Sequence, residues 1–165
     1  MAFRTGLRIA LKSAASFPSM AVRCLRLRRG RIGRMYDIKN ASAYSVFRET
    51  ANKNPLDGQP TVLVVGFRLK LAGQMSLLHW LFQRVCIVTT PFWSGLPGFG
   101  VKLWMVDPAG KKYLGVYEWH GTERAQAYVR FLLPVLNFFS VHGSVWHRMH
   151  ENTRLEAYLQ QGSRQ

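Results

Sequence analysis

The alternation of hydrophobic and polar residues along the second half of the chain predicts four strands. Phe67 and Leu69 alternate with Arg68 and Lys70 at the end of a β-branched stretch, a pattern typical of a strand. Apolar residues at helical spacing lie between the first two strands, between the last two, and after the fourth. The strands are predicted over 61–71, 99–106, 113–119 and 141–150, and the helices over 74–85, from 121 onward and over 152–159. The order β-α-β-β-α-β predicts an α+β fold with a ferredoxin-like unit.

Local signals refine the ends of these elements. Thr122 is the expected N-cap of the second helix, since its hydroxyl can accept a hydrogen bond from the first helical turn. Pro134 is expected to kink or end that helix, because proline lacks a backbone donor. Turn-forming residues predict a linker before the first strand, with a short strand or docking segment at 44–48. The expected divisions are an arm over 1–36, the linker over 37–60 and a folded domain over 61–165.

Positive charge is concentrated at the start of the chain. The net charge is +15, and the first 36 residues hold nine basic residues and no acidic one. Apolar residues from 3 to 17 gather on one side of a helix, and basic residues at four-residue spacing lie beside them. This pattern is typical of an amphipathic helix in an anionic membrane interface. The residues expected to contact the membrane are Arg4, Arg8, Lys12, Arg26, Arg28 and Arg29.

Other partners for this arm stay open. An organelle-targeting segment fits its arginine and serine content, whereas Arg8 and Lys12 interrupt the apolar run that a secretory signal needs. Nucleic-acid binding and a solvated basic tail are further alternatives. No apolar run approaches the roughly 18 residues of a membrane span. The sequence therefore favours a cytoplasmic protein attached peripherally to a membrane, with organelle targeting as the alternative, and leaves open whether the arm is cleaved.

Two stretches resemble the dimeric α+β barrel superfamily. Residues 96–104, Leu-Pro-Gly-Phe-Gly-Val-Lys-Leu-Trp, are similar to its second strand and the approach to it. Residues 113–128, which begin Tyr-Leu-Gly-Val-Tyr-Glu-Trp, are similar to its third strand and the helix that follows. The superfamily includes antibiotic-biosynthesis-type monooxygenases and their uncharacterised relatives. The resemblance covers about residues 61–150 and implies a ferredoxin-like fold and a homodimer, but no haem-ligand or catalytic motif is matched.

Strand alternation sorts the side chains of the predicted sheet onto two faces. One face, with Leu103, Met105, Tyr117 and Trp119 among others, is expected to pack under the helices. The second face combines two tryptophans with ion-pairable residues, a composition that suits an interface. In the superfamily that the chain resembles, this second face meets its twin and closes a barrel. The expected dimer-interface residues are Arg68, Lys102, Trp104, Glu118, Trp146 and Arg148.

The single acid on that second face has two interpretations. Glu118 is expected to form a cross-strand ion pair with Lys102 or Arg68. The alternative is a pocket carboxylate that acts as a general acid or base, which a lone carboxylate supports only weakly.

Candidate chemistry centres on a pocket between the sheet and the first helix. Phe67, Tyr117 and Trp119 are the expected ligand-binding residues, because their alternation aims them together. His79 and His147 are the candidate catalytic residues, since imidazoles titrate near neutrality. The alternative is that the histidines are structural and the aromatic residues belong to the core. Histidine spacing indicates no metal site, and no motif indicates a cofactor.

Three functions follow from these patterns. The first is a small-molecule-binding or structural dimeric barrel attached to an anionic membrane surface. The alternative is a cofactor-independent, monooxygenase-like enzyme that acts on an aromatic or polyketide-like substrate. A second alternative is nucleic-acid binding through the basic arm. The expected partners are a second copy of the chain, the membrane and an aromatic small molecule.

Overall fold

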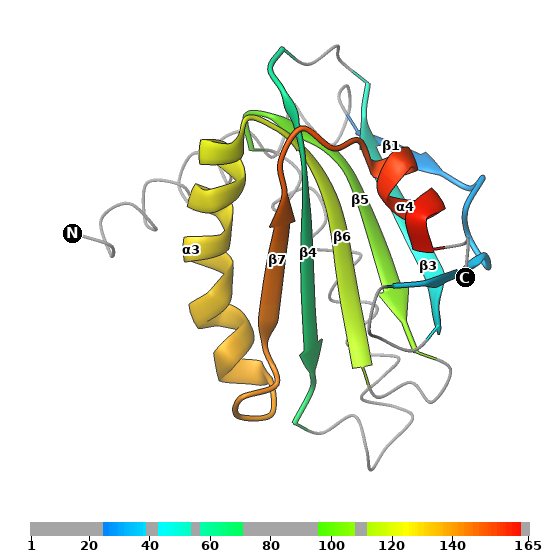
Figure 1. Ribbon diagram of the computed structural model, residues 1–165. Coiled ribbons are helices and arrows are strands. Elements are labelled where there is room, and N and C mark those ends of the chain that lie inside the picture. Colours follow the sequence, from blue (N-terminus) through cyan, green and yellow to red (C-terminus); the bar gives the residue numbers. More distant parts are fainter. Residues whose placement is uncertain (1–24, 39–42, 54–56, 71–95, 108–111, 163–165) are drawn as a thin grey trace.

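The computed structural model describes residues 25–38, 43–53, 57–70, 96–107 and 112–162 of the chain. These residues form an antiparallel seven-stranded sheet with one long and one short helix (Figure 1). The strands are β1 (Leu25–Arg28), β2 (Met35–Asp37), β3 (Ala43–Asn52), β4 (Pro60–Arg68), β5 (Phe99–Val106), β6 (Lys112–His120) and β7 (Trp146–His150). The helices are α3 (Thr122–Phe139) and α4 (Leu155–Gly162).

The order of the strands is that of a ferredoxin-like fold. The sheet runs β1-β3-β5-β6-β4-β7, with β2 also paired to β3. The four strands predicted from the pattern are β4, β5, β6 and β7, and α3 connects β6 to β7. The predicted α+β class and ferredoxin-like order are therefore confirmed. The predicted helix over 74–85 lies outside the described residues.

The sheet is wider than the sequence predicts, because residues 43–52 form a full strand. This segment was expected to be part of a linker with at most a short strand or docking segment over 44–48, yet β3 has ten residues and pairs with β5 along most of its length. A register shift between Val46 and Arg48 breaks the two-residue alternation in mid-strand. The bulge therefore removes the periodic signal by which strands are predicted. Within the expected arm, residues 25–28 form β1 at the edge of the sheet beside β3.

Helix α3 covers one face of the sheet, which we call the α3 face. Its buried residues pack on Leu63, Val65, Tyr117 and Trp119, and the ring of Tyr128 lies 4.9 Å from that of Trp119. The helix continues for five residues beyond Pro134, so the proline does not end it, and the kink expected as the alternative stays a prediction. A proline on an exposed helix face loses one backbone hydrogen bond, and the packed inner face holds the helix together.

The N-terminus of α3 differs from the prediction. Gly121 occupies the N-cap position with a φ of 105°, which favours glycine. Thr122 is the first helical residue, and its hydroxyl forms a 2.9 Å hydrogen bond with that of Thr61. The threonine thus ties the helix to β4 and does not cap it.

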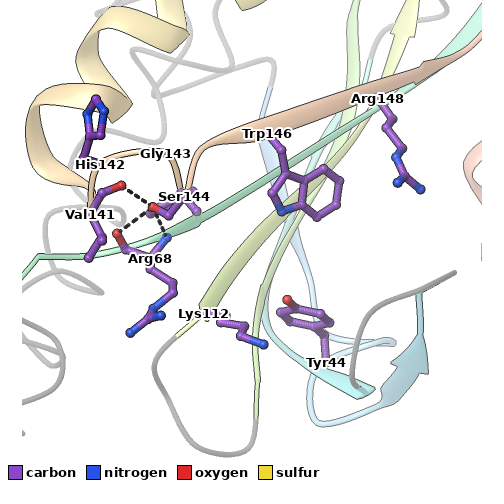
Figure 2. Close-up of a pocket in the computed structure, with 10 residues that line it drawn as sticks. Tyr44, Arg68, Lys112, Val141, His142, Gly143, Ser144, Trp146 and Arg148 are labelled. Carbon is purple, nitrogen blue, oxygen red and sulfur yellow. Dashed lines mark hydrogen bonds between the residues drawn. The ribbon is translucent and has the colours of Figure 1, made fainter.

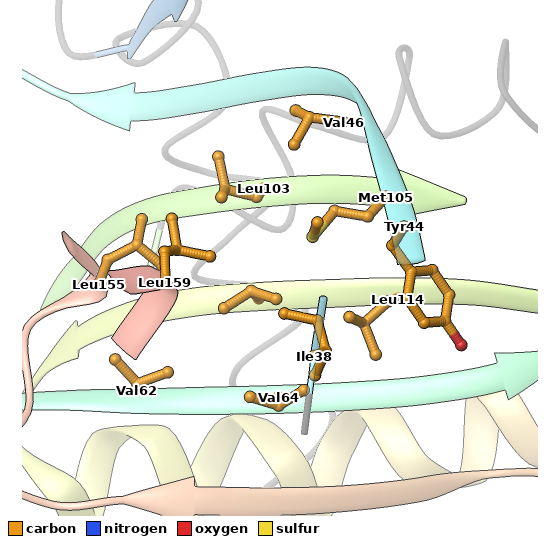
Figure 3. Packing of buried hydrophobic residues seen from close by; sticks show 11 residues of the cluster. Ile38, Tyr44, Val46, Val62, Val64, Leu103, Met105, Leu114, Leu155 and Leu159 are labelled. Atoms are coloured by element: carbon orange, nitrogen blue, oxygen red, sulfur yellow. The ribbon is translucent and has the colours of Figure 1, made fainter. Parts of the chain in front are cut away.

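A second core lies on the opposite face, which we call the α4 face. Leu155 and Leu159 of α4 and Ile38 pack over β4, β5 and β6 (Figure 3). These three side chains are at most 4% exposed. The chain therefore covers much of this face with its own residues.

A bulge near the start of β5 reverses the face of the sheet on which each later residue of that strand lies. The register between β5 and β6 shifts between Phe99 and Val101. As a result Leu103 and Met105, predicted to lie under the helices, pack on the α4 face. Lys102 lies opposite Tyr117 on the α3 face, with Trp104 on the same side of β5.

Arg31 connects three separate elements. It follows β1, and its guanidinium forms ion pairs with Glu49 of β3 and with Glu156 of α4. Glu49 is buried, with 1% of its side chain exposed, whereas Glu156 is exposed. The edge of the sheet and the C-terminal helix are therefore held together through one side chain.

Candidate functional site

A groove of about 560 Å³ opens on the α4 face, at the end of the sheet where β4 ends and β6 begins (Figure 2). Four strands and the turn after α3 contribute to it. We call it the β4-end groove. Its lining residues are Tyr44, Phe67, Arg68, Lys112, Val141, His142, Gly143, Ser144, Trp146 and Arg148.

The turn at 141–144 fixes one wall of the groove. The Val141 N–H donates to the carbonyl oxygen of Arg68 at 2.7 Å, and Ser144 Oγ donates to the Val141 carbonyl oxygen at 2.6 Å. The Arg68 N–H donates to Ser144 Oγ at 3.2 Å. Since these bonds join the turn to the end of β4, the predicted strand over 141–150 begins only at Trp146.

The indole of Trp146 forms an aromatic wall. Trp146 lies opposite Gly66 in the pairing of β7 with β4. A Cβ atom at Gly66 would collide with the indole ring, so the ring lies directly on the glycine backbone. Tyr44 points into the same space from β3 (Figure 2). The glycine therefore allows a large flat ring to lie close against the sheet.

The groove has a positive character. The side chains of Arg68, Lys112 and Arg148 line it, all three are exposed, and no ion pair involving them is present in the described part of the chain. The guanidinium carbon of Arg148 lies 5.7 Å from the centroid of the Trp146 ring. None of the eight acidic side chains of the chain lines the groove.

Asp107 and Tyr44 modify the electrostatics of one wall. Asp107 is buried and accepts a 2.8 Å hydrogen bond from the backbone N–H of Lys112. Burial, and secondarily the charge of Asp107, raise the pKa of Tyr44 above its ordinary 10.0. Tyr44 therefore presents a neutral hydroxyl at neutral pH.

The predicted pocket residues are found in different surroundings. Tyr117 and Trp119 are buried under α3, and the Tyr128 hydroxyl lies 3.4 Å from that of Tyr117. Phe67 stacks on Tyr113 and also lines the β4-end groove. His147 lies on the α3 face, as expected from the pairing of its strand, but it is exposed. His79 lies outside the described residues, so the pocket beneath the first helix stays a prediction.

The six residues predicted at a dimer interface do not share a face. Lys102 and Trp104 lie on the α3 face, because of the bulge in β5. Arg68, Glu118, Trp146 and Arg148 are on the other face, as their registers with β4 and β6 show. The prediction that all six lie on one face of the sheet is therefore wrong. Dimerisation itself stays a prediction.

Glu118 has a structural role that the sequence did not indicate. Its Oε2 accepts a 2.7 Å hydrogen bond from the backbone N–H of Leu155, the first residue of α4. Its Oε1 lies 3.4 Å from Nε2 of His120. The expected pair with Lys102 is wrong, since the two side chains are on opposite faces. A carboxylate at a helix N-terminus is favoured by the unsatisfied N–H groups there.

Lys102 is buried among aromatic rings on the α3 face. It is 2% exposed, and its Nζ lies 3.0 Å from the centroid of the Trp104 ring and 4.6 Å from that of Tyr117. An ammonium group over aromatic faces is stabilised by the ring quadrupoles. The ring of Trp104 thus contacts a cation, Lys102, of the same chain.

Among the described residues, no group of three or more histidine, cysteine, aspartate or glutamate side chains is placed to hold a metal ion. Within the same ranges no helix is long and apolar enough to cross a bilayer. Of the residues predicted to contact a membrane, Arg28 and Arg29 are exposed at the edge of the sheet, and Arg26 belongs to β1. Arg4, Arg8 and Lys12 lie outside the described residues.

Sequence reasoning missed Tyr44, Lys112 and the turn at 141–144 as parts of a site. Their positions in the sequence are far apart, and no motif links them. One signal was present: Lys112 directly precedes the strand predicted over 113–119, and Arg68 lies near the end of the strand predicted over 61–71. The register of β4 with β6 places these two cations opposite each other.

Comparisons with known proteins support the fold. No protein-family profile matches the sequence, and no curated protein sequence matches it. LmHde, a heme-degrading enzyme from Listeria monocytogenes, has a similar structure, with a TM-score of 0.51 and 10% identity over 76% of this chain and 87% of that chain. At this identity the similarity shows a shared fold.

Two further structures have lower scores. One is a major regulator of staphylococcal pathogenesis, with a TM-score of 0.47 and 13% identity over 68% of this chain and 69% of that chain. The other is an uncharacterised ferredoxin-fold protein from Listeria monocytogenes 4b F2365, related to antibiotic biosynthesis monooxygenases. Its TM-score is 0.44, with 12% identity over 80% of this chain and 94% of that chain. The ferredoxin-like fold that the resemblance implies is the fold of the described residues, which LmHde shares.

Proposed function

We propose that the protein binds a small, flat, negatively charged aromatic molecule in the β4-end groove. The observation that carries this proposal is the combination of the Trp146 ring with three cations and no acidic side chain. Ligand sites typically join an apolar surface to a few convergent polar groups. The aromatic part of the ligand would lie on the indole, and its negative charge would face the cations.

Each lining residue has a separate task in this arrangement. The Trp146 ring is supported from behind by the backbone of Gly66, so it offers a rigid platform for stacking. Arg68 and Arg148 present planar guanidinium groups that suit a carboxylate or phenolate. Tyr44 adds a neutral hydroxyl, because its raised pKa keeps the proton in place.

A second candidate function is oxidation of this ligand by a monooxygenase-like reaction. The fold shared with the heme-degrading enzyme of Listeria supports it. Positive charge in the groove favours the phenolate form of a bound phenol, which is more electron-rich than the phenol. Oxidation of a CH₂ group to a ketone uses one atom of O₂, and the two hydrogens leave with the other atom as water. Such a reaction needs no external reductant.

Binding measurements test the first proposal. Hydroxynaphthoates are expected to quench the tryptophan fluorescence of the full chain, whereas neutral hydroxymethylnaphthalenes of the same size should bind at least about tenfold more weakly. Arg148→Gln should weaken naphthoate binding by a similar factor. Arg130→Gln is the matched control, because Arg130 is an exposed arginine on α3 away from the groove. Equal binding of acids and neutral analogues would contradict the proposal.

Oxygen consumption tests the second candidate. Phenols that carry a ring CH₂ group, such as hydroxyanthrones, form the panel together with hydroquinone-type substrates. Hemin, with ascorbate supplied as the electron donor, is included because LmHde is named a heme-degrading enzyme. If the groove promotes ionisation, Arg148→Gln should shift the pH dependence of turnover to higher pH, since the phenol then keeps its proton longer. Binding without oxygen consumption would leave a binding protein and exclude the enzymatic candidate for this panel.

A further inference from the structure

Two adjacent phenylalanines at the end of α3 are exposed. Phe138 is 73% exposed and Phe139 is 56% exposed, and their rings meet edge to face with centroids 5.0 Å apart. Phe138 is the most exposed large apolar side chain in the described part of the chain. An exposed aromatic pair contributes little to the core and is typical of a surface that meets an apolar partner.

Lys70 contacts this aromatic pair, and further basic residues lie at the same end of the sheet. Lys70 Nζ donates to the Phe138 carbonyl oxygen at 2.8 Å and lies 5.9 Å from the centroid of its ring. The end of β4 and the start of β6 add Arg68 and Lys112 at the same end of the sheet. The turn after the two phenylalanines adds His142, which is exposed. We call this surface the basic end, defined by Arg68, Lys70, Lys112, Phe138, Phe139 and His142.

Acidic side chains concentrate at the opposite end of the sheet. There β4 begins, β6 and β7 end, and α3 begins, as the strand registers show. The acids near this end are Asp57, Glu118, Glu123, Glu151 and Glu156. Of the other three acids, Glu49 is paired with Arg31, whereas Asp107 and Asp37 lie toward the basic end, Asp107 buried there and Asp37 on β2 beside the start of β3. Lys53, Arg124 and Arg154 are exposed near the acidic end, so the two ends differ in their acidic residues more than in their cations.

We propose that the basic end docks on an anionic membrane interface, with Phe138 and Phe139 inserted among the headgroups. The exposed cations of the basic end would be attracted to a negative surface. Aromatic side chains beside cations suit the interface, where rings enter the acyl boundary and ammonium groups meet lipid phosphates. The β4-end groove then opens beside the membrane. This inference rests on the proposed function in one respect: the aromatic anion would be taken from the lipid phase.

This surface is distinct from the membrane contact predicted for the N-terminal arm. Arg28 and Arg29 lie beside β3, at the far edge of the sheet from β7 and α3 (Figure 1). Docking through Arg28 and Arg29 alone would leave Phe138 and Phe139 in water. The position of a label on the domain therefore distinguishes the two modes.

A fluorescence experiment on the full chain tests the orientation. An environment-sensitive dye is attached to His142→Cys or, as the matched control, to Glu151→Cys, in a background with Cys24 and Cys86 changed to Ser. These two exposed positions flank β7, one at each end of the sheet. With phosphatidylcholine–phosphatidylserine vesicles, the label at 142 should shift to the blue and be quenched by lipid-borne quenchers. The label at 151 should not change.

Substitution of the aromatic pair gives an independent readout. Phe138→Ser with Phe139→Ser should lower the partition onto phosphatidylserine vesicles about tenfold. Met35→Ser removes another exposed apolar side chain, 57% exposed on β2, and should change the partition little. Naphthoate binding without vesicles should be the same in the double variant, since neither phenylalanine lines the groove.

The possible results separate the two proposals. Vesicle binding with an unchanged label at 142 overturns the docking proposal and assigns the contact to the arm. Equal partition of the double variant and the wild type overturns it as well, and so does selective binding of an acidic protein or a nucleic acid by the basic end. Loss of naphthoate binding by Arg148→Gln, with or without docking, bears only on the proposed function.

Discussion

Trp146 and Gly66 depend on each other for the aromatic wall of the groove. In Gly66→Ala the new methyl group collides with the indole, which must move away from the sheet. We expect a loss of about 1–3 kcal/mol in the free energy of unfolding, the usual cost of overpacking, and weaker naphthoate binding. Urea denaturation measures the first effect. The control is the same change in a Trp146→Ala background, where the collision is absent and the loss should shrink; equal losses in both backgrounds would contradict the contact.

Tyr44 links the groove to the pH dependence of stability. Its pKa is raised in the folded protein, first by burial and then by Asp107, from an ordinary value of 10.0. The folded state therefore holds the phenolic proton more tightly than the unfolded chain does. This contribution is complete below pH 10 and is lost as the pH rises through the folded pKa.

The substitution Tyr44→Phe tests this sign. The melting temperature of the wild type should fall more steeply above pH 10 than that of Tyr44→Phe, and the two slopes should agree at neutral pH. The raised pKa of Tyr158 remains in both proteins and cancels in the comparison. Parallel curves through the alkaline range would show that Tyr44 does not carry the effect.

At the level of elements, the Arg31 ion pairs hold the edge strands to α4. Arg31→Ala leaves the carboxylate of Glu49 buried without its cation, which typically costs about 3–5 kcal/mol. The pair with the exposed Glu156 adds little by comparison. Chemical denaturation should show the large loss for Arg31→Ala and a much smaller one for Glu156→Gln. The double variant Arg31→Ala with Glu49→Gln should recover part of the stability, because the unpaired charge is gone.

For the whole molecule, the position of the N-terminal boundary matters. Deletion of residues 1–24 keeps every described strand, so the melting temperature should change by less than about 3 °C. Deletion of residues 1–36 removes β1, most of β2 and Arg31, and should lower the melting temperature by about 10 °C or more. Thermal melts followed by circular dichroism compare the two. If both deletions melt like the full chain, β1 and Arg31 contribute little to stability.

Dimerisation is a further question at this scale, because the α4 face that would meet a twin is largely covered. Ile38, Leu155 and Leu159 fill it from within the chain. The homodimer stays a prediction, which sedimentation velocity tests. A monomer at high micromolar concentration would contradict it. The surface formed by Trp104 and Trp146 together is excluded as its interface, since these residues lie on opposite faces.

The elements that the sequence predicted well are those whose signal is local. Strands β4 and β6 and helix α3 carry strong local patterns, β5 alternates regularly after the bulge near its start, and the order of these elements indicates the ferredoxin-like arrangement. The side of the sheet on which His147 lies also followed from simple alternation along one strand. These features depend on neighbours in the chain, so the amino-acid sequence by itself determined them.

Features that depend on bulges or on distant contacts were decided only by the tertiary structure. One extra residue near Phe99 moved Lys102 and Trp104 to the α3 face, and another near Val46 concealed β3. Glu118 bonds to a helix that begins 37 residues later. The β4-end groove joins four strands and a turn, and its charge depends on which side chains the registers bring together. A periodic pattern describes each segment alone, whereas a site of this kind exists only where the segments meet.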